Sequence, residues 1–284
     1  MNPAIWKRLI RAQYGLPLGL CILLQGLLIA GASPLLPILI SDKIGLDKAG
    51  VTVFFLINTL VGIVVALGTG YLSDGTIARH KLVLVGGGVA SLGYFGLSIA
   101  TRPVHAFLAG AIVAGFAVLF PQLFAVARGS VVADWKREDQ VVGITALRTL
   151  FSFGFILGTT LASVLARMME MQVIFLLVAA AIFALIVYAA RVLYRIEGQM
   201  AQRASRSAET TPHSSAESRR VVLPLYALVA PLVALTILRG ADSTRMVYLP
   251  LVLFDLFGDA SIAPLMFGIT AVAELITIGL VGYL

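Results

Sequence analysis

The sequence predicts an all-α protein that crosses a membrane several times. Of its 284 residues, 60% are hydrophobic and only 12% are charged, and the mean hydropathy is +0.99. Soluble domains carry about 25% charged residues, whereas a membrane-spanning helix needs about 20 mostly apolar residues in a row. Segments of that kind recur along this chain. Their continuous apolar character favours helices over the alternating strands of a membrane β-barrel.

Eight membrane-spanning helices are expected, each bounded by polar, charged or proline-containing residues. They lie at 14–40, 51–72, 82–101, 104–127, 142–166, 171–190, 221–254 and 262–284. The first follows a basic head but is too long for a signal peptide, so we interpret it as a spanning helix. The first and seventh exceed the length that a bilayer requires, and we expect them to tilt, protrude or kink at their prolines. These prolines are Pro17, Pro34 and Pro37 in the first segment and Pro224, Pro231 and Pro250 in the seventh.

The basic residues indicate an N-terminus in the cytoplasm, because arginine and lysine gather in cytoplasmic loops. With that orientation, the outer loops hold only Lys43, Lys48, Arg102 and Arg167 of the 21 basic residues. Three more, Arg148, Arg239 and Arg245, fall inside spans. The predicted inner segments hold the others: Lys7, Arg8, Arg11, Arg79, Lys81, Arg128, Lys136, Arg137, Arg191, Arg195, Arg203, Arg206, Arg219 and Arg220.

A polar segment divides the chain into two sets of spans. Residues 197–220 are rich in serine and alanine and have no apolar periodicity, which predicts a flexible cytoplasmic linker. His213 lies in it and is interpreted as a solvated side chain. Residues 1–196 would form a six-helix bundle, and residues 221–284 would form the first two helices of a second bundle.

The two sets are related by a weak internal repeat. FFLINTLVGIVVALGTGYL (54–72) aligns with MFGITAVAELITIGLVGYL (266–284), and the Asp42–Gly45 spacing recurs at Asp255–Gly258. Such symmetry is common in transporters, where the substrate site lies between the halves. If the second set copies the first, four more spans follow, and the chain is a fragment with eight of about twelve helices. The alternative is a natural eight-helix protein that ends inside the membrane.

The segment GYLSDGTIARHK, residues 70–81, resembles the signature loop of the major facilitator superfamily, although Ile77–Ala78 replaces the usual glycine before the basic pair. The resemblance implies a helix bundle of the major facilitator type with a cytoplasmic gate. In such a gate, Gly70 would permit close helix approach and Asp74 would pair with a helix terminus or an arginine. Arg79 and Lys81 would hold the inner face closed. The alternative is a plain basic inner loop.

Three further stretches are similar to the sugar efflux transporter family within that superfamily. They are FPQLFAVAR (120–128), TALRTLFSFGFILGTTLA (145–162) and FGITAVAELITIGLVGYL (267–284). This resemblance implies proton-coupled export of sugars and their analogues. The chain departs from the family at Gly158–Thr159–Thr160, where a Gly–Pro–Pro sequence is usual. Arg128, at the inner end of the fourth span, is expected to be a gate or anchor residue.

Polar residues inside the predicted spans are the candidates for a substrate or proton pathway. A charge at the bilayer centre costs roughly 2.5–3.5 kcal/mol, so such residues are normally paired or face a water-filled cavity. Gln25 and Asn58 would contact sugar hydroxyls or form hydrogen bonds between helices. The candidates are Gln25, Asn58, Gln122, Arg148, Arg239, Asp242, Arg245 and Glu274.

Glu274 is expected to carry the coupling proton, because it lies in mid-span and burial raises the pKa of a carboxyl group. The alternative is a structural pair with an arginine such as Arg148. Arg239, Asp242 and Arg245 are spaced by three and share a helix face, predicted in the outer half of the seventh span. They would face the cavity between the halves, or they would mark the end of the span, with 246–254 in a loop.

These features together predict a proton-coupled secondary transporter that exports sugars or related molecules by alternating access. The alternatives are a multidrug or amphiphile exporter and a receptor or scaffold. An enzyme is not expected, because no metal-spaced cluster, G-x-S-x-G or phosphate loop is present. No cofactor, metal or nucleic-acid partner is expected, and Cys21 is interpreted as a packing residue. We expect a monomer, in contact with lipid, in a bacterial inner membrane.

Overall fold

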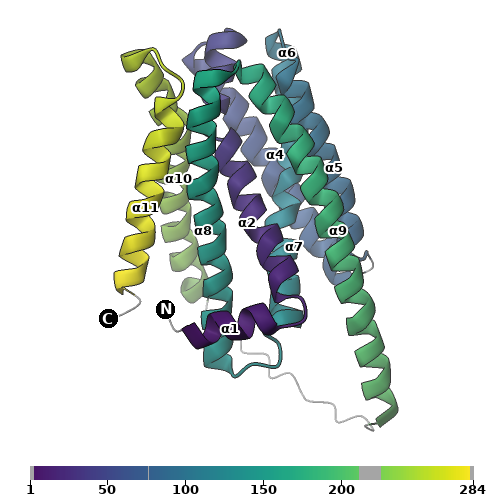
Figure 1. Ribbon diagram of the computed structural model, residues 1–284. Coiled ribbons are helices and arrows are strands. Elements are labelled where there is room, and N and C mark those ends of the chain that lie inside the picture. Colours follow the sequence, from purple (N-terminus) through teal and green to yellow (C-terminus); the bar gives the residue numbers. More distant parts are fainter. Residues whose placement is uncertain (1–2, 76, 211–224, 282–284) are drawn as a thin grey trace.

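The computed structural model describes residues 3–75, 77–210 and 225–281, and all regular structure in these ranges is helical. Long helices run side by side, and the short helix α1 (Pro3–Arg11) lies across one end of the bundle (Figure 1). Arg8 fixes α1 to the bundle, since its Nη1 lies 3.0 Å from Asp139 Oδ2 and its guanidinium lies over the ring of Trp135. The predicted all-α class is therefore confirmed.

The first predicted span is helical but interrupted. It consists of α2 (Gly15–Ala32), the short α3 (Leu36–Ile38) and the π-helix η1 (Leu39–Lys43). A turn at residues 33–35 separates α2 from α3. Pro34 lies in this turn, and its missing N–H explains why the regular helix breaks there.

The second to sixth predicted spans are helical as well. In the described ranges, these five and the first are the segments long and apolar enough to cross a membrane. The fourth is irregular, with a 3₁₀ and a π segment flanking α7. The helices are α4 (Lys48–Gly75), α5 (Arg79–Ser98), α6 (Pro103–Val113), η2 (Ala114–Val118), α7 (Leu119–Val126), η3 (Ala127–Val131), α8 (Arg137–Met168) and α9 (Met171–Thr210).

The seventh and eighth predicted spans coincide with α10 (Leu225–Phe257) and α11 (Ile262–Val281). Within α11, Ile262–Thr277 is apolar but shorter than the six segments above. The total of eight spans therefore stays a prediction. Because α10 continues to Phe257, the alternative that residues 246–254 form a loop is wrong.

The first part of the predicted flexible linker is helical instead, because α9 runs on to Thr210. The sequence EGQMAQRASRSAE, residues 197–209, contains many good helix formers. Lack of an apolar face was therefore mistaken for lack of helix. Residues 211–220, including His213, lie outside the described ranges.

The core is built by close pairs of helices. α8 packs against α2 on one side and against α11 on another, and α5 packs against α9. At Gly154 an added β-carbon would overlap the backbone carbonyl of Leu23, so α2 and α8 touch through their backbones. Cys21 is fully buried on α2, as expected of a packing residue.

In the part of the chain that the structure describes, the two glycines with positive φ agree with the internal repeat. Gly45 (φ 79°) lies between η1 and α4, and Gly258 (φ 66°) lies between α10 and α11. These are the matched positions that the sequence comparison paired. Both need the left-handed backbone region, which glycine enters without a steric penalty.

Candidate functional site

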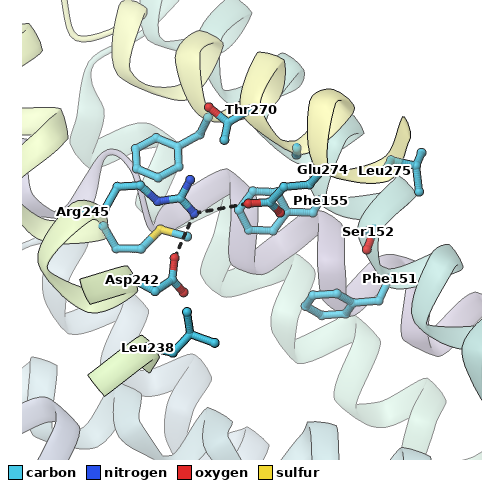
Figure 2. A pocket seen from close by; sticks show the side chains of 12 residues that line it. Phe151, Ser152, Phe155, Leu238, Asp242, Arg245, Thr270, Glu274 and Leu275 are labelled. Atoms are coloured by element: carbon cyan, nitrogen blue, oxygen red, sulfur yellow. Dashed lines mark hydrogen bonds and ion pairs between the residues drawn. The ribbon is translucent and has the colours of Figure 1, made fainter. Parts of the chain in front are cut away.

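A cavity of about 480 Å³ lies between α8, α10 and α11. Figure 2 shows Asp242 and Arg245 from α10 meeting Glu274 from α11, beside Phe151 and Phe155 from α8. We call it the central cavity. It is lined by Phe151, Ser152, Phe155, Leu238, Asp242, Arg245, Met246, Phe267, Thr270, Ala271, Glu274 and Leu275.

Arg245 links the two acidic residues of the central cavity. Its Nη2 donates to Asp242 Oδ1 at 2.8 Å and lies 3.7 Å from Glu274 Oε1, so one guanidinium joins α10 to α11 (Figure 2). The same guanidinium carbon lies 5.7 Å from the centre of the Phe267 ring, within the range of a cation–π contact. Asp242 and Arg245 pair because residues three apart lie on the same face of a helix.

The charged cluster of α10 lies near the middle of that helix, with Asp242 and Arg245 just on the C-terminal side of its midpoint. α10 extends on both sides of Asp242 and Arg245, and these residues lie beside Phe151 and Phe155 in the middle of α8. The placement of this cluster in the outer half of the membrane stays a prediction. The side chain of Arg239 lies outside the described part of the structure.

Glu274 faces the central cavity but is not buried by protein, because 61% of its side-chain surface is accessible. The described helices therefore do not bury the Glu274 carboxyl group as expected. Its arginine neighbour is Arg245, so the alternative of a pair with Arg148 is wrong. Arg148 instead lines a second cavity on α8, together with Arg128.

The amide side chains of the predicted pathway do not line the central cavity. Asn58 Nδ2 donates to the carbonyl of Gly110 at 2.6 Å, which is the interhelical hydrogen bond given as its alternative. Gln25 and Gln122 are buried, with exposed fractions of 1% and 2%. Both Gln25 amide atoms and Gln122 Oε1 have no hydrogen-bond partner among the described residues.

The Gln25→Leu variant is expected to be at least as stable as the parent protein. An unsatisfied buried amide costs about 1–3 kcal/mol, and an apolar side chain of similar size removes that cost. Thermal unfolding in detergent measures the effect. Gln140→Leu is the matched control and should lower the midpoint, because Gln140 Nε2 donates to the carbonyls of Ala133 and Trp135. An equal loss in both variants would mean that the Gln25 amide is satisfied.

The predicted cytoplasmic gate differs from expectation at several positions. A β-carbon at Gly70 would meet nothing within 4 Å, so this glycine does not serve close helix packing in the described structure. Lys81 is exposed and forms no ion pair with a described residue. The side chain of Asp74 lies outside the described part.

The gate loop is instead fixed to α9 by Glu197. The Arg79 backbone N–H donates to Glu197 Oε1 at 2.7 Å, and His80 Nδ1 lies 2.6 Å from Glu197 Oε2. Tyr194 packs edge-on against the His80 ring. This contact joins α5 to α9 within the first set of helices. This contact was not predicted, because the sequence places Glu197 at the start of the expected linker.

Contacts at the end of the bundle opposite α1 join the two sets of helices, and none was predicted. The Thr52 and Tyr248 hydroxyls lie 2.6 Å apart, and Lys48 Nζ lies 3.5 Å from Asp255 Oδ2. At the same end, Arg167 Nε donates to Ser261 Oγ at 3.0 Å.

Asp259, beside Ser261, completes this set of contacts. The backbone N–H of Ser261 donates to Asp259 Oδ1 at 2.8 Å. That hydrogen bond, followed by one to the Ser261 side chain and then by the charge of Arg167, lowers the pKa of the Asp259 carboxyl. The carboxylate therefore stays charged and keeps the α10–α11 loop in place.

The site contains charges, hydroxyls and aromatic rings, but no arrangement for a metal. Within the described ranges, no group of three or more His, Cys, Asp or Glu side chains is placed to hold a metal ion. The central cavity offers a guanidinium and two carboxylates to the polar groups of a ligand, and three phenylalanines to an apolar face.

Comparisons with known proteins agree with a transporter architecture. A family model described as the Major Facilitator Superfamily matches residues 18–284 of the chain. A protein of Deinococcus radiodurans named as a putative sugar efflux transporter is 28% identical over 168 residues. That match covers 58% of this chain and 43% of the relative, so it spans less than half of the relative's length.

Proposed function

Because the chain belongs to the major facilitator superfamily, we propose that it is a secondary transporter that exports sugars or related small polar molecules by proton-coupled alternating access. The observation that carries this proposal is the Asp242–Arg245–Glu274 cluster in the central cavity. The name of the Deinococcus relative supports the choice of sugars.

Substrate binding would use both chemistries of the central cavity. Sugar hydroxyls can accept hydrogen bonds from Arg245 and donate to Asp242 or Glu274. The C–H faces of a sugar ring can pack on the phenylalanines of α8 and α11, Phe151, Phe155 and Phe267. A substrate bound in the central cavity would contact α8 of the first set and α10 and α11 of the second. A position between the two halves is the one expected for the substrate site of a transporter.

Proton coupling would depend on Glu274. When charged, its carboxylate is attracted to Arg245 across 3.7 Å; when protonated, it loses this attraction and leaves Arg245 to Asp242 and the substrate. The contacts at the end opposite α1 would then break and re-form as the halves rock. By the distribution of basic residues, that end would face outward, with the N-terminus in the cytoplasm of a bacterial cell.

A multidrug or amphiphile exporter is the second candidate. The observation that favours it is the aromatic wall of the central cavity, since three phenylalanines suit an apolar ring as well as a sugar. The two candidates share the site and the mechanism, and they differ in substrate.

Proton flux in liposomes tests both candidates. The full-length protein is reconstituted with an internal pH dye and challenged with a panel of sugars and amphiphilic drugs. We expect sugar-dependent proton flux in the parent protein and at least about tenfold less in Glu274→Gln. A tenfold lower rate corresponds to an activation free energy that is about 1.4 kcal/mol higher. Glu170→Gln, an exposed glutamate at the α8–α9 junction, is the matched control and should keep the flux.

Flux with amphiphiles alone would assign the protein to drug export. Transport by Glu274→Gln that keeps its full pH dependence would remove Glu274 from proton coupling and leave the substrate assignment in place.

A further inference from the structure

A second cavity, of about 580 Å³, lies between α7 and α8 on the α1 side of the central cavity. Its α8 wall is one face of the first three turns of that helix, and its other wall comes from α7 and η3. We call it the arginine groove. It is lined by Phe120, Phe124, Ala125, Arg128, Arg137, Gln140, Val141, Ile144, Thr145 and Arg148.

The arginine groove carries three positive charges and no negative one. Arg128, Arg137 and Arg148 line it, and no ion pair joins any of them to another residue in the described ranges. The nearest acidic residues in the sequence do not line it: Asp139 pairs with Arg8, and Glu138 lies outside the lining. The groove is therefore an uncompensated cationic surface.

Arg148 has no ionic partner among the described residues although it lies inside a predicted span. It lies about 16 Å along α8 from Arg137, at 1.5 Å per residue, and therefore inside the membrane-spanning segment. Charged side chains at such positions are normally paired or hydrated within a cavity. An anion entering the groove would provide the missing partner, and a guanidinium suits carboxylate and phosphate because its fork can donate two parallel hydrogen bonds.

Aromatic rings connect the arginine groove to the central cavity. The Phe120 and Phe124 ring centres lie 4.4 Å apart, and Phe120 lies edge-on to Phe151 at 5.3 Å. Phe151 also lines the central cavity, so the two cavities are neighbours along α8. A ligand that leaves the groove past Phe120 would reach the Arg245 cluster.

From this geometry we propose that the arginine groove binds the carboxylate or phosphate of an anionic small molecule, a sugar acid or a sugar phosphate, before it enters the central cavity. This inference rests on the proposed transport function and narrows its substrate class from polar to negatively charged. Arg128 and Arg148 hold the anionic group, and Phe120 and Phe124 offer an apolar face to the rest of the molecule.

Binding calorimetry on the full-length protein in neutral detergent tests the inference. D-glucuronate and glucose 6-phosphate are expected to bind at least about tenfold more tightly than glucose, and to lose affinity as sodium chloride is raised. In the Arg128→Gln/Arg148→Gln variant this preference should fall to within about twofold. Arg191→Gln/Arg195→Gln, which removes the same charge from α9, is the matched control and should keep the preference.

Equal affinity for glucose and the two anions would overturn the inference, as would an equal loss of preference in the control variant. Glucuronate binding that disappears in phosphatidylglycerol nanodiscs but not in phosphatidylcholine nanodiscs would assign the groove to a lipid headgroup instead. Proton flux separates the two proposals. If neutral sugars elicit flux and no anion binds, the arginine groove is not an anion site and the transport proposal stands. If anions bind but no compound elicits flux, the groove binds anions and the transport proposal is wrong.

Discussion

Replacing Arg245 with glutamine is expected to lower substrate-dependent flux by at least about tenfold, which corresponds to about 1.4 kcal/mol. Arg245 is the residue that both carboxylates of the central cavity contact, at 2.8 Å from Asp242 and 3.7 Å from Glu274. Without it, two negative charges share one cavity inside the membrane and the cation that attracts them is lost. Because these side chains are partly solvent-exposed, we expect a larger effect on transport than on stability.

Two further variants test whether the effect of Arg245→Gln is specific to the guanidinium in the central cavity. Arg245→Lys keeps the charge but loses the planar fork, and it should retain part of the flux. Arg102→Gln, which removes an exposed arginine before α6, should retain all of it. Full flux in Arg245→Gln would contradict the assignment of the central cavity as the transport site.

Replacing Gly154 with leucine is expected to destabilise the protein by about 3 kcal/mol or more, since overpacking a tight contact forces backbone shifts. A side chain there would overlap the carbonyl of Leu23, and one at Gly158 would overlap the carbonyl of Leu27. The α2–α8 contact therefore has no room for either. Because α8 carries Phe151 and Phe155 into the central cavity, the same shift would also displace the site.

Thermal unfolding and size-exclusion profiles in detergent measure the loss. Gly68→Leu is the matched control, because a β-carbon at Gly68 on α4 would meet nothing within 4 Å. That variant should be at least as stable as the parent, given the higher helix propensity of leucine. Equal stability of the two variants would mean that α2 and α8 do not pack through their backbones.

Much of the fold can be predicted from short stretches of sequence, without knowledge of which helices pack together. Apolar runs of sufficient length predict the helices, and the break at Pro34 follows from the missing N–H of proline. The membership of the superfamily was indicated by the motif at residues 70–81 and is confirmed by the match over residues 18–284. The extension of α9 to Thr210 was missed, because a polar helix lacks the apolar periodicity on which the expectation rested.

Three of the predicted pathway residues line the central cavity, but their arrangement was not predicted. Asp242, Arg245 and Glu274 were candidates because they are charged residues inside predicted spans, where an unpaired charge is costly. Which of these residues meet depends on the packing of α10 against α11, and no local pattern gives that. The close α2–α8 contact has a local signal in the sequence GFILG, since Gly154 and Gly158 are four residues apart, the spacing typical of closely packed membrane helices.

Substrate protection of a cysteine placed in the central cavity tests the account most directly. Ser152→Cys puts a thiol in the lining, while the native Cys21 is buried and should not react. Maleimide labelling of Ser152→Cys is predicted to slow at least about threefold with any compound that elicits proton flux, since a bound substrate would cover the lining. Labelling of Lys136→Cys, an exposed position before α8 outside the cavity lining, should not change. Unchanged labelling of Ser152→Cys at saturating concentrations of such a compound would place the transport site elsewhere.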